Sequence, residues 1–433
     1  MEIQAGDTAW LLTSAALVML MTPALGFFYA GMARGKNVLA TIMQSFIIVA
    51  LVSVIWVLWG YSLAFGPTLG GFIGGLQYLG FANVGQEPNG AYAATVPHLA
   101  FAVYQCMFAV ITPALITGAF AERKKFSTFL VFTALWSTLI YAPIAHWVWS
   151  CTPVEGAEAV AGCSGIPGWL RSWGALDFAG GTVVHVSSGM AALAAAIVFG
   201  RRQGYGEIPI EPHDISMTVL GAALLWFGWF GFNAGSALGA GGLAANAFVV
   251  TNTSAAAAAL AWMAISWWQS GKPSVLGAAS GAVAGLVAIT PAAGFVTPGA
   301  AVIIGLVAGI ACFFAVQLRN RMQIDDSLDV FGIHGVGGAW GAVATGIFAT
   351  LAVNAAGANG LLAGNPGQLG IQVAAVAITG SFSFGATFLL LKVLDRLMGL
   401  RVSPEEEAAG LDLSLHGEVT AYRYEERRVL PRS

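Results

Sequence analysis

Charged residues are scarce in this chain. Aspartate, glutamate, lysine and arginine together make up 9% of the 433 residues, whereas apolar residues make up 57%. Soluble domains carry roughly 25% charged residues, so the composition excludes an ordinary soluble domain. The net charge of −3 offers no broad positive surface, and we expect no nucleic-acid partner.

Sequence motifs of several other protein classes are missing. There is no Walker A sequence, so ATP-driven transport has no support, and the glycine-rich signature of potassium filters does not occur. The sequence also lacks an H-E-x-x-H motif, a paired intramembrane aspartate motif and a G-x-S-x-G motif with catalytic partners. We therefore expect neither enzyme activity nor a cofactor.

Cysteine is also rare, with four residues in the chain. Cys106 and Cys312 lie in apolar runs, where we expect them to pack as small apolar side chains. Cys151 and Cys163 share the loop 150–176, and they can form a disulfide if that loop faces an oxidising compartment. Since the sequence does not fix their separation, the bonded and the free state both stay open.

Long apolar runs are what the chain has in abundance. Each is near the ~20 residues that cross a bilayer, and their apolar character is continuous rather than alternating as in a β-barrel. Glu2 and Asp7 stand where a signal peptide carries basic residues, so we expect no cleaved leader. The sequence predicts an all-α integral membrane protein with eleven transmembrane helices, at residues 8–31, 38–65, 98–120, 127–149, 177–199, 214–236, 246–269, 274–292, 299–318, 331–353 and 369–392.

Lysine and arginine gather in alternate loops, and Arg171 alone falls in the other set. Since cytoplasmic loops carry the excess of these residues, we expect an extracytoplasmic N-terminus and a cytoplasmic C-terminus, in the cell inner (plasma) membrane. The cations that follow the odd-numbered spans are Arg34, Lys36, Arg123, Lys124, Lys125, Arg201, Arg202, Lys272, Arg319, Arg321, Lys392, Arg396, Arg401, Arg423, Arg427, Arg428 and Arg432.

Two sequence patterns indicate an internal repeat. Asp177 and Asp326 each precede a histidine by eight residues, at His185 and His334. A helix that begins at each aspartate would carry each imidazole ~12 Å into the membrane. Phe28–Gly31 at the end of span one similarly resembles Phe232–Gly235 at the end of span six. Because five spans separate the copies, we expect an inverted 5+5 repeat plus a final helix, with a shared site at the repeat interface.

Five stretches together carry a resemblance to one known family: Ala119–Arg123, Gly174–His185, Phe227–Ser236, His334–Gly338 and Gly410–Glu418. They resemble the ammonium transporters (Amt/Mep/Rh), and within that family the Amt branch. The resemblance covers essentially the whole chain and implies an eleven-helix homotrimer with a pore through each protomer. It also implies ammonium and methylammonium as substrates.

His185 and His334 match the paired pore histidines of that family and are the predicted proton relay. A lone buried histidine is usually a structural group, but two on facing helices can hydrogen-bond each other and line a path. A zinc site is the competing interpretation, and it lacks a third ligand. Asp177 is interpreted as a structural cap that accepts backbone N–H bonds, with direct binding of the cation as the alternative.

Aromatic residues and one hydroxyl match the family's outer recruitment site. By resemblance, Trp149 lies at the mouth, Phe108 and Phe232 form the gate below it, and Ser236 supplies the hydroxyl. Tyr104, one turn before Phe108, falls where the family carries an aromatic residue. An aromatic cage attracts a small cation without a fixed anion. The plainer alternatives are membrane-interface anchoring for Trp149 and core packing for Phe108.

The expected function is membrane transport of ammonium. An ammonium ion faces a prohibitive cost in a dry apolar pore, but it can lose a proton and cross as NH3, an option that potassium does not have. The resemblance to the Amt branch implies that the proton follows, giving net charge movement. The alternatives are a passive gas channel of the Rh kind, with the same two histidines, and an ammonium sensor whose main output is signalling.

We expect residues 1–392 to form the membrane domain and residues 393–433 to form a cytoplasmic regulatory tail. Ser403 is followed by proline and glutamates, which predicts a capped helix start. The stretch Gly410–Glu418 is expected by resemblance to pack beneath a neighbouring protomer. A PII signalling protein is a possible partner on this face. We expect the basic loops to hold the tail's acidic residues, aided by the alternating leucines Leu411, Leu413 and Leu415.

Overall fold

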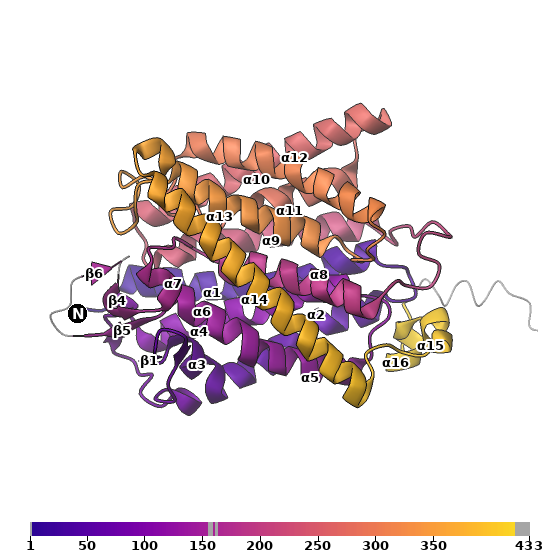
Figure 1. The fold of residues 1–433 in the computed structure, drawn as a ribbon, viewed down its shortest axis with the longest axis horizontal. Helices are drawn as coiled ribbons and strands as arrows, with labels where there is room; N and C mark the ends of the chain where they lie inside the picture. The colour runs from indigo at the N-terminus through magenta and orange to yellow at the C-terminus, as the bar shows by residue number, and fades with distance from the viewer. Residues whose placement is uncertain (1, 155–158, 161–162, 421–433) are drawn as a thin grey trace, which may run out of the picture.

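The structure is a computed structural model that describes residues 2–154, 159–160 and 163–420. Long helices run side by side, with short strands at one end and two short helices at the other (Figure 1). We call these the strand end and the tail end. Four of the cations used to predict the orientation lie outside the described residues: Arg423, Arg427, Arg428 and Arg432.

Each of the eleven predicted apolar runs coincides with a helix, and nine helical segments of the described chain are long and apolar enough to cross a membrane. The nine are α1 (Ala5–Met32); α2 (Val38–Ile55) with η1 (Trp56–Gly60) and α3 (Tyr61–Phe65); α4 (His98–Ile116) with η3 (Thr117–Ala119); α5 (Phe126–Trp136) with η4 (Ser137–Tyr141) and α6 (Ala142–Trp149); η5 (Gly181–Val186) with α8 (Ser187–Phe199); α9 (Ile215–Ala234) with η6 (Gly235–Ala237); α10 (Gly242–Ser270); α12 (Pro298–Arg321); and α14 (Pro366–Met398). The other two are α11 (Val275–Ile289), a shorter apolar helix, and η7 (Phe331–Gly335) with α13 (Val336–Phe348).

Short elements occupy the two ends. The strands are β1 (Thr68–Leu69), β2 (Ile73–Gly74), β3 (Pro88–Asn89), β4 (Ala93–Pro97), β5 (Cys151–Pro153), β6 (Ala159–Val160) and β7 (Cys163–Pro167), paired antiparallel as β1–β2, β3–β4 and β5–β7–β6. The remaining short helices are η2 (Leu79–Phe81), α7 (Trp169–Ser172), η8 (Leu361–Ala363), α15 (Pro404–Ala409) and α16 (Leu411–His416).

Two of the four cysteines form a disulfide and the other two are free, which is one of the arrangements that the sequence left open. Cys151 and Cys163 form a disulfide across the β5–β7 hairpin, with their Cα atoms 5.6 Å apart. Cys106 and Cys312 are free and buried, in agreement with a packing role. The disulfide lies at the strand end, so it closes the loop that begins directly after α6.

Neither helix that carries a histidine begins at its aspartate: the first begins at residue 181 instead of the predicted 177, and the second begins at residue 331, as its span predicted. After Asp177 the helix begins at Gly181, because Gly180 has a φ of 122°, a left-handed conformation that glycine tolerates. After Asp326 it begins at Phe331, because Asp329 has a φ of 61°. The expectation of unbroken helix from each aspartate is therefore wrong, and the ~12 Å rise derived from it does not apply.

The described part of the long helices contains four π-helical segments: η1 and η4 lie inside a helix, and η5 and η7 begin one. A π segment hydrogen-bonds i to i+5 and usually appears as a single turn inside an α-helix. Two of these segments contain the predicted pore histidines, His185 in η5 and His334 in η7. The local backbone at both histidines therefore differs from the α-helix that the sequence predicted.

The last long helix crosses the bundle diagonally (Figure 1) and continues past residue 392 to Met398. At the tail end, Ser403 caps α15 and forms a reciprocal capping box with Glu406, which confirms the predicted helix start. Of the alternating leucines expected to hold the tail, Leu411 is buried in a cluster with Ala40 and Leu415 packs against that cluster, whereas Leu413 is 37% exposed. All three lie in the short helix α16.

Buried charges tie the loops together at the tail end. Glu122 accepts from Arg34 at 2.6 Å and lies 3.4 Å from Arg202. Arg202 also donates to Asp325 at 2.9 Å, and Arg123 lies 3.9 Å from the same carboxylate. Burial alone would raise the pKa of Asp325, but Arg123 and Arg202 outweigh it and hold the pKa below its usual value. Within the described residues these three arginines bind acids of the loops. The tail's Glu407 accepts instead from the backbone nitrogen of Gln203, in the loop that carries Arg202.

Candidate functional site

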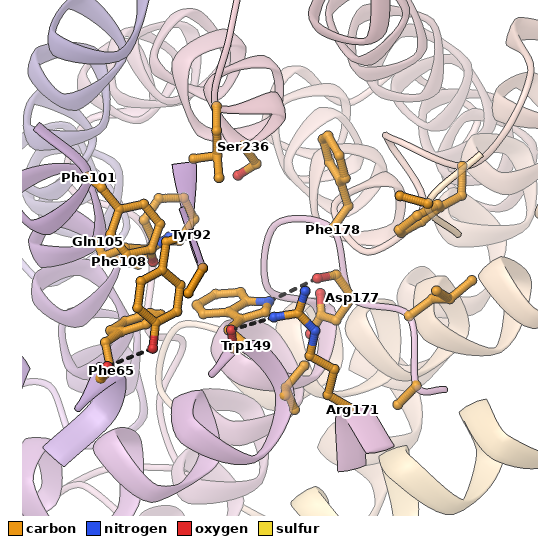
Figure 2. A pocket seen from close by; sticks show the side chains of 17 residues that line it. Phe65, Tyr92, Phe101, Gln105, Phe108, Trp149, Arg171, Asp177, Phe178 and Ser236 are labelled. Carbon is orange, nitrogen blue, oxygen red and sulfur yellow. Dashed lines mark hydrogen bonds between the residues drawn. The ribbon is translucent and has the colours of Figure 1, made fainter. Parts of the chain in front are cut away.

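A cavity of about 200 Å³ lies at the strand end of the bundle (Figure 2). Side chains from α4, α6, η6 and the segment between α7 and η5 line it. The lining includes four predicted site residues and two that the sequence did not single out: Trp149, Phe108, Ser236 and Asp177, with Gln105 and Arg171.

Trp149 is the last residue of α6, so it stands where that helix ends beside the cavity. Its indole Nε1 donates a hydrogen bond of 2.9 Å to the carbonyl oxygen of Asp177 (Figure 2). Its ring meets the Phe108 ring edge-on, with centroids 5.8 Å apart. These two contacts fix the orientation of the indole at the cavity wall.

Aromatic rings lead from the cavity toward the histidines. The centroids of Phe108 and Phe232 are 4.4 Å apart, and both side chains are almost fully buried. The Phe232 ring lies 6.1 Å from the His185 ring at an angle of 26°, and Trp229 stacks on the same imidazole at 5.5 Å. Phe108 therefore lines the cavity, Phe232 packs against Phe108, and His185 is the next ring in the series.

Tyr104 lies behind this wall and not in the lining of the cavity. Its ring contacts Phe108 at 5.0 Å, and its hydroxyl donates to the carbonyl oxygen of Phe232 at 2.8 Å. The hydroxyl also lies 3.1 Å from Ser236 Oγ, which itself donates to the Phe232 carbonyl at 2.9 Å. Tyr104 thus contacts both phenylalanines and the Ser236 hydroxyl.

His185 and His334 meet in the interior. Their Nδ1 atoms are 3.2 Å apart and their ring planes are inclined by 25°. Both imidazoles are buried, and the Nε2 atom of His185 has no hydrogen-bond partner. At 3.2 Å one Nδ1 can donate a proton to the other, which is the geometry that a two-histidine proton relay requires.

The histidine pair depends on a close approach of two helices. A Cβ atom at Gly338 of α13 would lie 2.8 Å from the Cβ of His185 and 3.0 Å from the backbone nitrogen of Val186. Glycine is therefore required there for the backbone of α13 to pack against η5. Gly338 ends the His334–Gly338 stretch named in the sequence, and this contact gives it a structural role.

The Asp177 carboxylate is fully used by the start of its helix. Its two oxygens accept from the backbone nitrogens of Gly180, Gly181, Thr182 and Val183 at 2.6–3.2 Å, and from the Thr182 hydroxyl at 2.5 Å. These are the contacts expected of a structural cap. Although Asp177 lines the cavity, its carboxylate is already engaged with these donors.

The described residues contain no cluster of three or more histidine, cysteine, aspartate or glutamate side chains that could hold a metal ion. The two histidines therefore stand without the further ligands that a tetrahedral zinc site requires.

The sequence patterns singled out neither Arg171 nor His146. The structure buries His146 completely, with Nδ1 3.0 Å from the Ala64 carbonyl oxygen and Nε2 2.8 Å from the Thr68 hydroxyl. These partners lie in α3 and β1, which are distant in the sequence, so no local pattern shows the contact. Arg171 was missed for the same reason, because the sequence does not show which residues a single cation in a loop contacts.

Comparison with known proteins identifies the family of this chain. Its sequence matches the Ammonium Transporter Family over residues 9–422. The chain belongs to the ammonium transporter family. Among its relatives in that family, an ammonium transporter of Bacillus subtilis is 50% identical over 417 residues, covering 96% of this chain and 98% of the relative. Ammonium transporter Amt1 of Archaeoglobus fulgidus is 52% identical over 414 residues, with the same coverage of 96% and 98%.

Solved structures in the ammonium transporter family share the fold. Mep2 of Saccharomyces cerevisiae is 38% identical with a TM-score of 0.84, covering 93% of this chain and 89% of the other. A protein described as Sensor Amt Protein is 30% identical with a TM-score of 0.84, covering 95% and 98%. Together with the nine apolar helices, the family membership makes this a multi-pass membrane protein.

Proposed function

We propose that this protein transports ammonium by recruiting NH4+ in the cavity, removing a proton and passing NH3 along the histidine pair. The observation that carries the proposal is the series of contacting rings from Trp149 through Phe108 and Phe232 to His185. The relatives named as ammonium transporters support the substrate. On this proposal the activity is transport and not catalysis.

The recruitment site attracts a cation without a free anion. Trp149 and Phe108 supply aromatic faces, and Ser236 supplies a hydroxyl at the cavity. Because the carboxylate of Asp177 is taken up by backbone donors, it leaves cation attraction to the aromatic rings. This arrangement favours a partly hydrated cation over aromatic faces. It also avoids the tight, unselective binding that a free carboxylate would give.

Deprotonation supplies the selectivity. Beyond Phe108 lie the buried rings of Phe232 and Trp229, and a bare cation among them would lose most of its hydration. Ammonium avoids this cost by leaving its proton behind, whereas potassium has no proton to lose. The Nδ1–Nδ1 contact of His185 and His334 offers a relay for that proton, so we propose that transport moves net charge.

The proposed arrangement has eleven spans: the nine long segments, α11, and η7 with α13. The N-terminus and the strand end face outward, and the tail end faces the cytoplasm of a cell membrane. An inverted repeat is supported by local structure, because Asp326 accepts from the backbone of Phe331 at 2.7 Å just as Asp177 accepts at the start of η5. By its family resemblance the protein assembles as a homotrimer.

Transport itself is tested by current recordings from purified protein in liposomes. Ammonium and methylammonium gradients should each drive a current, and a potassium gradient should drive none. A sensor role is the second candidate, because the structure described as Sensor Amt Protein shares this fold. Absence of ammonium flux from a well-folded preparation would favour the sensor. Flux without current would favour a passive gas channel.

Trp149→Leu should weaken recruitment while leaving the assembly intact. Loss of the aromatic face should cost about 1–2 kcal/mol for a partly desolvated cation, which raises the ammonium concentration for half-maximal current by roughly five- to thirtyfold. Ser236→Ala should shift the same concentration in the same direction by a smaller factor. The recruitment site lies elsewhere if both variants keep the parent's concentration dependence.

We further propose that residues 393–433 regulate transport and that residues 1–392 form the transport domain. The described part of the tail is anchored to the loop before α2. Lys36 Nζ donates to the carbonyl oxygens of Glu407 and Ala408 at 2.9 and 2.7 Å. Asp412 Oδ1 accepts from the Ala40 backbone at 2.8 Å, which ties α16 to the start of α2. A PII signalling protein is the proposed partner at this face.

Deleting residues after Gly410 should lower transport without preventing assembly, because the long helices bury their own interfaces. As a matched pair, Leu411→Ala removes a side chain that is fully buried, and Leu413→Ala removes one that is 37% exposed. Transport should fall in the first variant only. Pull-down with a PII protein at varied ADP, ATP and 2-oxoglutarate tests the partner. Full activity after the deletion, without nucleotide-dependent binding, would mean a constitutive pore.

A further inference from the structure

The β5–β7 hairpin brings Arg171 to the end of the helix that carries Trp149. The chain leaves α6 at Trp149, forms β5, and returns as β7 into α7. The register pairs Cys151 with Pro167, and the next backbone contact is the Gly168 nitrogen donating to the Ser150 carbonyl at 3.2 Å. This pairing, closed by the Cys151–Cys163 disulfide, places α7 beside the last turn of α6.

The close approach is built into the sequence at Gly168. A Cβ atom there would lie 2.6 Å from the carbonyl oxygen of Trp147, so glycine is required for α7 to reach the end of α6. Arg171 then extends its guanidinium to that helix end. Its Nη1 atom donates to the carbonyl oxygen of Trp149 at 2.9 Å (Figure 2). The same atom donates to the carbonyl oxygen of Ser150 at 3.4 Å.

These bonds have a clear physical basis. The last carbonyl groups of a helix have no partners within it, and a cation stabilises both these groups and the negative end of the helix dipole. A guanidinium is well suited to the position, because several donors lie on one rigid plane. Trp149 is therefore held at two points, by Arg171 at its carbonyl oxygen and by the Asp177 carbonyl at its indole nitrogen.

We infer that Arg171 is a positioning residue for Trp149, which sets the apparent affinity for the recruited cation. The inference rests on the proposed recruitment function of Trp149. Arg171 also lines the cavity, so a second role is conceivable in which its charge repels the incoming cation directly. The two roles predict opposite results. Loss of positioning weakens recruitment, whereas loss of repulsion strengthens it.

The test is a double-mutant cycle measured as ammonium-driven current in liposomes. Arg171→Met should raise the half-maximal ammonium concentration on the order of fivefold, with the maximal current changed much less. In the Trp149→Leu background the same substitution should add no further shift, because the residue through which it acts is gone. Arg171→Lys keeps a cationic donor and should restore part of the affinity. Ser172→Ala, an exposed neighbour in α7, is the matched control and should behave like the parent.

Three results would overturn the inference. The first is an equal rise in half-maximal ammonium concentration on replacing Arg171 in the parent and in Trp149→Leu. The second is a lower half-maximal concentration in Arg171→Met, and the third is an unchanged one in Arg171→Met while Trp149→Leu raises it. A Trp149→Leu variant with unchanged affinity would instead refute the recruitment site itself, so the two failures are distinguishable. If Arg171→Met does not assemble, Arg171→Gln retains a planar donor and takes its place in the same cycle, with the same expected direction and the same refuting outcomes.

Discussion

Replacing both His185 and His334 with alanine is expected to reduce ammonium-driven current at least tenfold. The substitution removes the paired imidazoles, which are buried beside the rings of Trp229 and Phe232. Without a group that accepts and passes a proton, the charge cannot follow the neutral molecule. The measurement is current at saturating ammonium in liposomes, with each single variant recorded alongside the double variant.

Potassium is the informative second ion in that experiment. If the pore selects by removing a proton, a variant without the imidazoles has space for water and can admit potassium, so a new potassium current would support the scheme. His416→Ala, at the tail end and away from the path, is the matched control for loss of a histidine. A double variant that carries ammonium normally and still rejects potassium would remove the histidines from the mechanism.

Asp177→Ala is expected to prevent stable folding. The carboxylate accepts four backbone N–H groups and one hydroxyl at the start of η5, and these donors are buried. Each buried donor left without a partner costs about 1–3 kcal/mol, so the total is comparable to the stability of a typical domain. The yield of assembled protein in size-exclusion chromatography should fall sharply, and the melting temperature of any remaining protein should be lower.

Two further variants calibrate this result. Asp177→Asn keeps one acceptor oxygen and should be intermediate in melting temperature. Asp214→Ala removes an N-cap that makes one side-chain bond, to the Met217 nitrogen at 3.1 Å, and should cost only about 1 kcal/mol. An Asp177→Ala protein that assembles and melts like the parent would show that the carboxylate is not structural and would revive the alternative of direct cation binding.

Local properties of the fold were predictable from the sequence. The run predicted at 38–65 coincides with the helical segment Val38–Phe65. An apolar span consists of consecutive residues, so its length can be counted directly in the sequence. The Ser403 capping box was predictable for the same reason, since its two partners are three residues apart. The start of η5 was not predictable from the sequence. The break at Gly180 depends on which backbone N–H groups donate to the Asp177 carboxylate.

Some residues of the candidate site could be predicted from the sequence and others could not. The aspartate–histidine spacing and the aromatic motifs identified residues that the structure brings together, with His185 beside His334 and Phe108 beside Phe232. Arg171 was counted only as an exception to the charge pattern. Its contact with Trp149 depends on the register of a hairpin, which no local pattern in the sequence specifies.

The buried ion pairs at the tail end bear on how the molecule can move. Glu122 follows α4 and Asp325 follows α12, and Arg202 contacts both carboxylates with side chains that are at most 5% exposed. A transporter that alternates access by rocking one half against the other would have to separate such contacts in every cycle. Breaking a buried pair costs about 3–5 kcal/mol. A stationary scaffold, in which side-chain motion at Phe108 and Phe232 admits each molecule, avoids this recurring barrier.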